Sequence, residues 1–187
     1  MLTLCSASPR RRELLASVGL VFDVVAPDID ESRRAGEPVL EYVERLAREK
    51  VSAGLRDWSG VGIAADTIVV LGDEVLGKPR DRKDAARMLG LLSGREHFVI
   101  TGVAVQGKTV RAGWVRTAVR LRALSPAALR WLVESGDGDD KAGGYAVQGL
   151  AGSFIEKIDG SLTNVVGLPI PEALELLAEE GVKPPWA

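Results

Sequence analysis

A carboxylate interrupts the most apolar stretch of the chain. Asp66 lies within GIAADTIVVL, residues 62–71, whose small and β-branched residues are typical of a strand buried on both faces. An ionised carboxylate in such a place costs several kcal/mol unless a cation or a metal binds it. Because carboxylates in such surroundings cluster at functional sites, we expect Asp66 to be functional. A turn cap or a structural ion pair with an arginine is the alternative.

Three arginines open the first expected helix. In SASPRRREL, residues 6–14, a proline follows serines at a helix start, so Arg10, Arg11 and Arg12 fall in the first turn. That end of a helix already carries about half a positive charge, and its backbone N–H groups favour phosphate. The pattern predicts a phosphate-binding helix start. Arginines that point into solvent or pair with acids are the alternative.

Acidic residues gather in the loop before the second expected helix. Asp28, Asp30 and Glu31 lie there. Mg²⁺ usually binds one or two carboxylates together with oxygens of a phosphate substrate. Asp66 with one of these three acids would supply such a metal–phosphate site, and a solvated acidic loop is the alternative.

A glycine-rich segment, GDGDDKAGGYAVQG, spans residues 136–149. It is not an EF-hand, because Lys141 and Gln148 stand where a calcium loop needs acids. The Gln148 amide is a candidate for reading the donor and acceptor groups of a nucleobase, near Tyr145. A loop that only turns the chain is the alternative.

The remaining candidates gain a role only through their neighbours. Lys50 and Lys78 are expected to be surface lysines unless the fold brings them to Asp66. His97, the only histidine, is expected to be a hydrogen-bonded structural residue, and Cys5, the only cysteine, a buried and unreactive thiol. One histidine and one cysteine give little material for a nucleophilic triad and none for a disulfide.

Helices that alternate with strands are expected to position these residues. Apolar runs predict strands over 2–5, 22–26, 60–72, 97–106 and 109–124, a short return over 73–75, and two short strands within 153–166. Periodicity and capping residues predict helices over 9–19, 39–55, 81–92, 126–136 and 169–180. The alternation predicts an α/β domain with a mixed sheet.

Composition excludes several classes of protein. The 187 residues are 46% hydrophobic and 27% charged, which argues against disorder. A net charge of −2 lacks the basic excess of a non-specific DNA binder. No signal-peptide pattern or membrane-spanning run is visible. We expect one cytoplasmic domain over residues 1–187, with no membrane or nucleic-acid partner.

Together these motifs resemble the Maf family of nucleoside triphosphate pyrophosphatases, which are also described as septum-formation inhibitors. The resemblance is carried by segments 6–14, 45–54, 64–71, 73–79, 92–103, 140–149 and 160–169. It implies an elongated single α/β domain, with a central mixed sheet flanked by helices and a nucleotide cleft, related to inosine triphosphate pyrophosphatases. It also implies a homodimer that hydrolyses a nucleoside triphosphate to the monophosphate and pyrophosphate with a divalent metal, Mg²⁺ or Mn²⁺.

The resemblance also implies residue roles. Asp66 matches the proton acceptor, and Glu31 matches an acidic ligand of metal or water. The implied catalytic residues are Asp66, Glu31 and Lys50, with Glu31 and Asp66 as the metal ligands. The implied substrate-binding residues are Ser8, Arg10, Arg11, Thr67, Lys78 and Gln148.

Three positions distinguish the branches of this family. Arg10, Thr67 and Gln148 resemble the branch that prefers dTTP and UTP. The branch that prefers 7-methyl-GTP has a bulky aromatic residue in place of the first arginine and a glutamine after the aspartate. A 7-methyl-GTP enzyme, and a nucleotide-binding regulator of septation that does not depend on turnover, are the alternatives.

Overall fold

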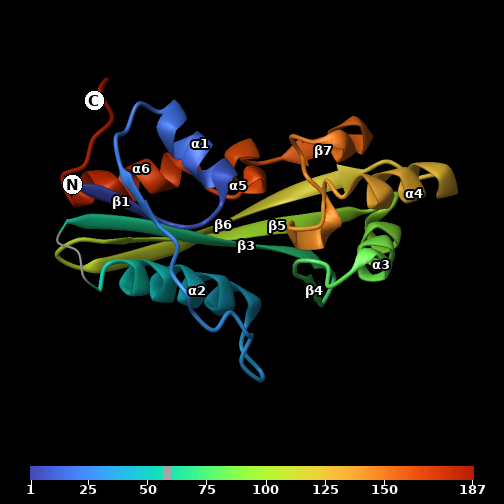
Figure 1. Ribbon diagram of the computed structural model, residues 1–187, viewed down its shortest axis with the longest axis horizontal. Helices are drawn as coiled ribbons and strands as arrows, with labels where there is room; N and C mark the ends of the chain where they lie inside the picture. The colour runs from blue at the N-terminus through green and yellow to red at the C-terminus, as the bar shows by residue number, and fades with distance from the viewer. Residues whose placement is uncertain (57–59) are drawn as a thin grey trace. The chain divides into compact units, whose positions relative to one another are not determined.

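The computed structural model describes residues 1–56 and 60–187 and shows an α/β fold with a mixed sheet (Figure 1). The seven strands found within these ranges are β1 (Leu2–Cys5), β2 (Asp23–Val25), β3 (Val61–Leu71), β4 (Glu74–Leu76), β5 (Glu96–Gln106), β6 (Val110–Leu121) and β7 (Ile155–Asp159). The α-helices of the described residues are α1 (Pro9–Ser17), α2 (Val39–Gly54), α3 (Arg82–Leu92), α4 (Pro126–Ser135), α5 (Leu162–Val166) and α6 (Ile170–Glu179). Two short 3₁₀ helices are η1 (Ala142–Gly144) and η2 (Leu150–Phe154).

The sheet has the order β2-β1-β3-β5-β6-β7, and β4 pairs with β3 at one side of this path. β1 runs parallel to β2 and β3, whereas the β3–β4 and β6–β7 pairs are antiparallel. The mixed sheet and the short return strand after β3 are therefore confirmed. None of the helices in the described parts of the chain combines the length and the apolar character that a bilayer crossing needs.

One expected element is wrong. The second of the two strands expected within 153–166 is helix α5, Leu162–Val166. Its start is fixed by Ser161, whose Oγ accepts a hydrogen bond from the Asn164 N–H at 3.2 Å and whose carbonyl accepts one from the Val165 N–H at 3.2 Å. This serine cap outweighs the strand preference of the valines that follow.

The chain folds into two compact units. The first comprises Met1–Asp66, Thr101–Val115 and Gly167–Ala187, and the second comprises Thr67–Ile100 and Arg116–Val166. Each unit has an apolar core of its own. Strands β3, β5 and β6 contribute residues to both units.

In the first unit, helices cover both faces of the strands, with α1 and α6 on one face and α2 on the other (Figure 1). Alternate residues of a strand point to opposite faces. Ile63 and Ala65 of β3 therefore pack in the core that contains residues of α1 and α6, whereas Ala64 packs with Ala47 and Val51 of α2. Asp66 continues the alternation of Ala64 and lies on the α2 face.

Helix α2 approaches strand β5 backbone to backbone at a glycine. A Cβ atom on Gly102 would lie 2.2 Å from the carbonyl oxygen of Val43. Only glycine allows this distance between helix and strand, since a real Cβ atom needs more than 3 Å. The packing of α2, and of every side chain that α2 carries toward the sheet, depends on this contact.

We therefore expect Gly102→Ala to lower the free energy of unfolding by roughly 1–3 kcal/mol, because the added methyl group forces α2 away from the sheet. The control is Gly113→Ala in β6, where nothing lies within 4 Å of the added Cβ. Urea denaturation followed by circular dichroism measures both. Equal stability of the two variants would contradict the close packing of α2.

The segment between β2 and α2 is fastened to the helix by a two-point ion pair. Arg45 of α2 donates to both carboxylate oxygens of Glu37, at 2.5 and 2.9 Å. The side chains are 14% and 8% exposed, so water screens this pair little. The hydrogen bonds from Arg45 lower the pKa of Glu37 to about 2.

This pKa predicts an acid-sensitive contribution to stability. The unfolded chain binds more protons than the folded chain between the ordinary pKa of 4.5 and the folded value of about 2, so stability falls as the pH falls through this window. Glu37→Gln should therefore be less stable than the wild type at neutral pH, and the difference should shrink below pH 4.5.

Urea denaturation over a pH series checks this expectation. The matched control is Glu44→Gln, which removes a more exposed pair with Arg48 on the same helix and should change stability less. A stability difference for Glu37→Gln that stays constant down to pH 2 would contradict the assignment.

Candidate active site

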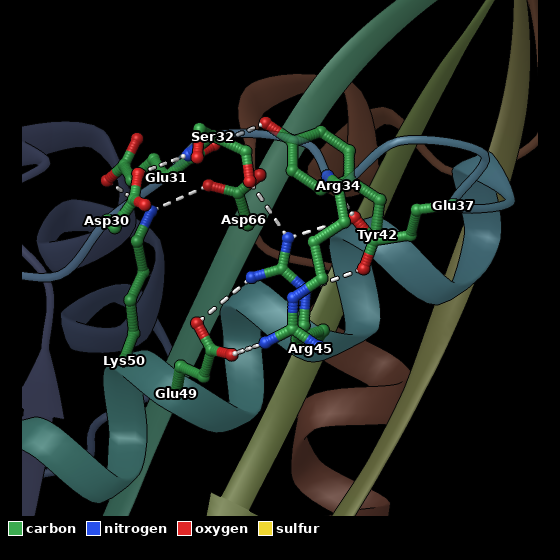
Figure 2. Close-up of polar contacts among 10 residues, drawn as sticks. All are labelled: Asp30, Glu31, Ser32, Arg34, Glu37, Tyr42, Arg45, Glu49, Lys50 and Asp66. Atoms are coloured by element: carbon green, nitrogen blue, oxygen red, sulfur yellow. Dashed lines mark hydrogen bonds and ion pairs between the residues drawn. The ribbon is translucent and has the colours of Figure 1, made fainter.

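A buried lysine lies between two carboxylates in the first unit (Figure 2). Lys50 Nζ is 2.6 Å from Oδ1 of Asp66 and 2.8 Å from Oε1 of Glu31. Lys50 and Asp66 are each 7% exposed, whereas the side chain of Glu31 is 51% exposed. The cation that forms the ion pair with Asp66 is therefore a lysine. The alternative of a structural ion pair with an arginine had named a different partner. Lys50 is thus the exception allowed for above, because the fold brings it to Asp66.

The secondary structure explains why these three groups meet. Lys50 lies on the buried face of α2, one turn after Leu46 and Ala47, and its apolar stem runs along that face. Asp66 lies on the face of β3 that α2 covers. Glu31 comes from the loop that precedes α2, so the loop must return over the helix to place its carboxylate beside the ammonium group.

Contacts with α2 hold the loop segment that carries Glu31 (Figure 2). The Tyr42 hydroxyl donates to the backbone oxygen of Glu31 at 2.7 Å, and Arg45 donates to the backbone oxygen of Ser32 at 3.0 Å. Burial, followed by the charges of Asp66 and Glu31, raises the pKa of Tyr42. Sequence reasoning missed Tyr42 and Arg45 as positioning residues. Their spacing of three on one helical face was the available signal.

The other two acids of this loop lie elsewhere. Asp28 and Asp30 line a hollow of about 390 Å³ in the first unit, together with Ile29, Glu49, Ser52, Ala53 and Arg56. The Asp30 side chain also accepts a hydrogen bond from the Ser32 N–H at 2.9 Å. Of the three acidic candidates, Glu31 is therefore the residue that joins Lys50 and Asp66.

The charges of Asp66 and Glu31 also act on the arginine-rich start of α1, at Arg11. Arg11 Nε donates to the backbone oxygen of Gly167 at 2.7 Å, and Nη1 donates to Ser6 Oγ at 3.3 Å. Burial lowers the pKa of Arg11, and the negative charge of Asp66 opposes this shift. Arg11 is thus held in place inside the first unit, whereas Arg12 is exposed.

Ser8 stands at the amino-terminal end of α1. Its N–H donates to Ser6 Oγ at 3.2 Å, and its backbone oxygen accepts from the Arg12 N–H at 3.2 Å. Its side chain makes no capping hydrogen bond within this described helix. The hydroxyl of Ser8 and the half-buried side chain of Arg10 both belong to this helix start.

The remaining site candidates belong to the second unit. Thr67 follows Asp66 in β3 and is partly buried, whereas Lys78 and Gln148 are exposed in turns. The Gly143 N–H donates to the backbone oxygen of Gly77 at 3.0 Å. The glycine-rich segment that carries Gln148 is therefore joined to the turn that carries Lys78.

The carboxylates of Asp66 and Glu31 are the residues here that could bind a divalent metal ion. Their oxygens converge within 2.8 Å of a single cationic nitrogen, and carboxylate oxygens are the ligands that Mg²⁺ prefers. Across residues 1–56 and 60–187, no three His, Cys, Asp or Glu side chains are grouped to hold a metal. A metal at Asp66 and Glu31 would therefore need oxygens of water or of a phosphate substrate as further ligands.

Two residues expected to be structural are confirmed as such. Cys5 is buried, and burial raises the pKa of its thiol to about 11, which keeps it protonated and unreactive. His97 is buried and hydrogen-bonded to Tyr145.

The chain is similar to proteins that have already been named. The chain is 50% identical to a Myxococcus xanthus protein named dTTP/UTP pyrophosphatase, over 100% of this chain and 95% of that protein. It is 49% identical to a Shewanella oneidensis protein of the same name, over 97% of this chain and 98% of that one.

Among solved structures, the Staphylococcus aureus Ham1 protein is similar with a TM-score of 0.46 and 12% identity, over 64% of this chain and 71% of that one. The family model described as Maf-like protein matches residues 1–180. The chain therefore belongs to the Maf-like protein family.

Proposed function

We propose that the protein hydrolyses dTTP and UTP, and modified pyrimidine nucleotides of the same shape, to the monophosphate and pyrophosphate. The observation that carries this proposal is the cluster of Asp66, Lys50 and Glu31 in a chain of the Maf-like family. The charges of its two acids act on Arg11 in the arginine-rich start of α1. Relatives at 49 and 50% identity over nearly their full length are named dTTP/UTP pyrophosphatase, which supports the same substrate class.

The reaction follows from the chemistry of these side chains. Asp66 accepts a proton from a water molecule whose oxygen forms a bond to the α-phosphorus. The bond from the α-phosphorus to the oxygen that bridges to the β-phosphorus breaks, and pyrophosphate leaves with that oxygen. Lys50 holds the Asp66 carboxylate in place from 2.6 Å. A divalent metal such as Mg²⁺ or Mn²⁺, held by Glu31 and Asp66, would neutralise charge on the triphosphate.

Basic side chains are the proposed ligands of the phosphates. Arg10 and Arg11, with the hydroxyl of Ser8, bind the phosphates at the start of α1, where the helix dipole also favours negative charge. Lys78 stabilises charge on the leaving pyrophosphate.

Asp66→Asn should lower kcat at least about a hundredfold, because the amide cannot accept the proton of the attacking water. We expect KM to change less than about threefold, because the amide leaves the phosphate-binding side chains in place. Pyrophosphate release from dTTP measures both constants. Asp23→Asn, at an exposed position on β2, is the matched control and should be fully active. Near-normal turnover of Asp66→Asn would contradict the proposal.

Arg10, Thr67 and Gln148 are the proposed determinants of nucleobase preference. A panel of triphosphates with product analysis should show dTTP and UTP hydrolysed faster than CTP and 7-methyl-GTP. Gln148→Ala should lower kcat/KM for dTTP about tenfold, because a donor and an acceptor for the base edge are lost. Much faster hydrolysis of 7-methyl-GTP than of dTTP would contradict the assignment.

The same experiment separates an enzyme from a regulator. A regulator of septation that only binds nucleotides would release no pyrophosphate from any member of the panel.

We place the enzyme in the cytoplasm, in keeping with a chain that has one buried cysteine. We also propose that it is a homodimer and that it removes nucleotides from the pool.

A further inference from the structure

The second unit contains a buried pair of polar aromatic side chains that the proposed reaction does not use. His97 Nε2 and the Tyr145 hydroxyl oxygen are 2.7 Å apart, and the two rings meet edge to face at 84°. His97 is 1% exposed and Tyr145 is 6% exposed. A buried hydroxyl needs a hydrogen-bond partner, and the imidazole ring, 48 positions away in the sequence, supplies it.

This hydrogen bond joins two neutral groups. Burial lowers the pKa of His97 to about 4 and raises the pKa of Tyr145. Both groups are therefore uncharged near neutral pH, and neither is suited to exchange protons with a substrate there. The pair is instead suited to fix the position of the segment that contains Tyr145.

That segment leads directly into the turn that carries Gln148. The turn is closed by a hydrogen bond from the Gly149 N–H to the backbone oxygen of Ala146, at 3.2 Å. Ala146 is buried beside Tyr145, whereas Gln148 is exposed. The side chain of Gln148 thus projects from a turn whose first residue directly follows the buried tyrosine.

The far end of the turn is fastened as well. The Asp137 carboxylate accepts a hydrogen bond from the Leu150 N–H at 3.0 Å. The contact is close, because a Cβ atom on Gly149 would lie 2.0 Å from the same carboxylate. The turn with Gln148 is therefore held at both ends, by the hydrogen bond that the Leu150 N–H donates to Asp137 and by the one between Tyr145 and His97.

We infer that the hydrogen bond between His97 and Tyr145 sets nucleobase selectivity, because it fixes the turn that presents Gln148 to the base. The inference rests on the proposed function, in which Gln148 reads the base. His97 and Tyr145 are positioning residues that act through Gln148. A shift of the Gln148 side chain by a fraction of an ångström weakens its hydrogen bonds to the base. Discrimination between bases is therefore lost before binding of the triphosphate is lost.

Tyr145→Phe removes the hydroxyl and keeps the ring. We expect KM for dTTP to rise about five- to tenfold and the preference for dTTP over CTP to fall by a similar factor. kcat for dTTP should change less than about twofold, because the groups around Asp66 are untouched. His97→Leu should have the same effect, whereas His97→Gln, which keeps a polar partner for the hydroxyl, should restore part of the preference.

A core variant separates positioning from stability. Val119→Ala, in the core of the second unit, removes buried apolar volume and leaves the hydrogen bond intact. It should lower the free energy of unfolding without changing the ratio of kcat/KM for dTTP to kcat/KM for CTP. The inference would be overturned if Tyr145→Phe kept the wild-type ratio of kcat/KM between dTTP and CTP. It would also be overturned if the variant lost kcat equally for every nucleotide.

Hydrogen exchange supplies a readout that does not need activity. The amides of Gly149 and Leu150 should exchange faster in Tyr145→Phe than in Val119→Ala at matched stability. Unchanged exchange at these amides would overturn the inference even in an active enzyme. Failure of the wild type to release pyrophosphate, with faster exchange at these amides in the variant, would overturn the proposed function and retain the positioning of the turn.

Discussion

One ammonium group must satisfy two carboxylates, and the local structure of the first unit follows from this requirement. Lys50 lies on the buried face of α2, where an unpaired cation would be costly. Asp66 meets it from β3, and Glu31 meets it from the loop. Helix α2 must therefore lie close to the sheet, which Gly102 permits, and the loop must return over the helix. The hydrogen bonds from Tyr42 and Arg45 to the backbone of this loop hold it over the helix.

The same cluster suits the chemistry that we propose. Two carboxylates around one ammonium group leave an excess of negative charge, which a divalent metal can balance. Arg11 at the start of α1 is partly buried, and the charges of both acids act on it. In the proposed reaction the arginines bind oxygens of the triphosphate, and the acids would bind its metal. The whole-chain charge of −2 averages over these local charges and does not reveal them.

Much of the fold could be predicted from the sequence, because local signals agree with the final structure. The burial of Asp66 followed from the apolar run around it, and capping residues marked α3 and α4. The path of the chain in three dimensions could not be predicted from these local signals. The burial of Lys50 depends on the position of α2, and the bond between His97 and Tyr145 joins residues far apart in sequence. Helix α5 was missed because the cap at Ser161 overrides its valines.

In the proposed reaction, the cluster around Lys50 activates the water molecule that attacks the α-phosphorus of a nucleoside triphosphate. Hydrolysis of dTTP in water labelled with heavy oxygen tests it most directly, with mass spectrometry of both products. Attack at the α-phosphorus places the label in dTMP and leaves pyrophosphate unlabelled. Label in pyrophosphate, or release of orthophosphate as the first product, would contradict the account.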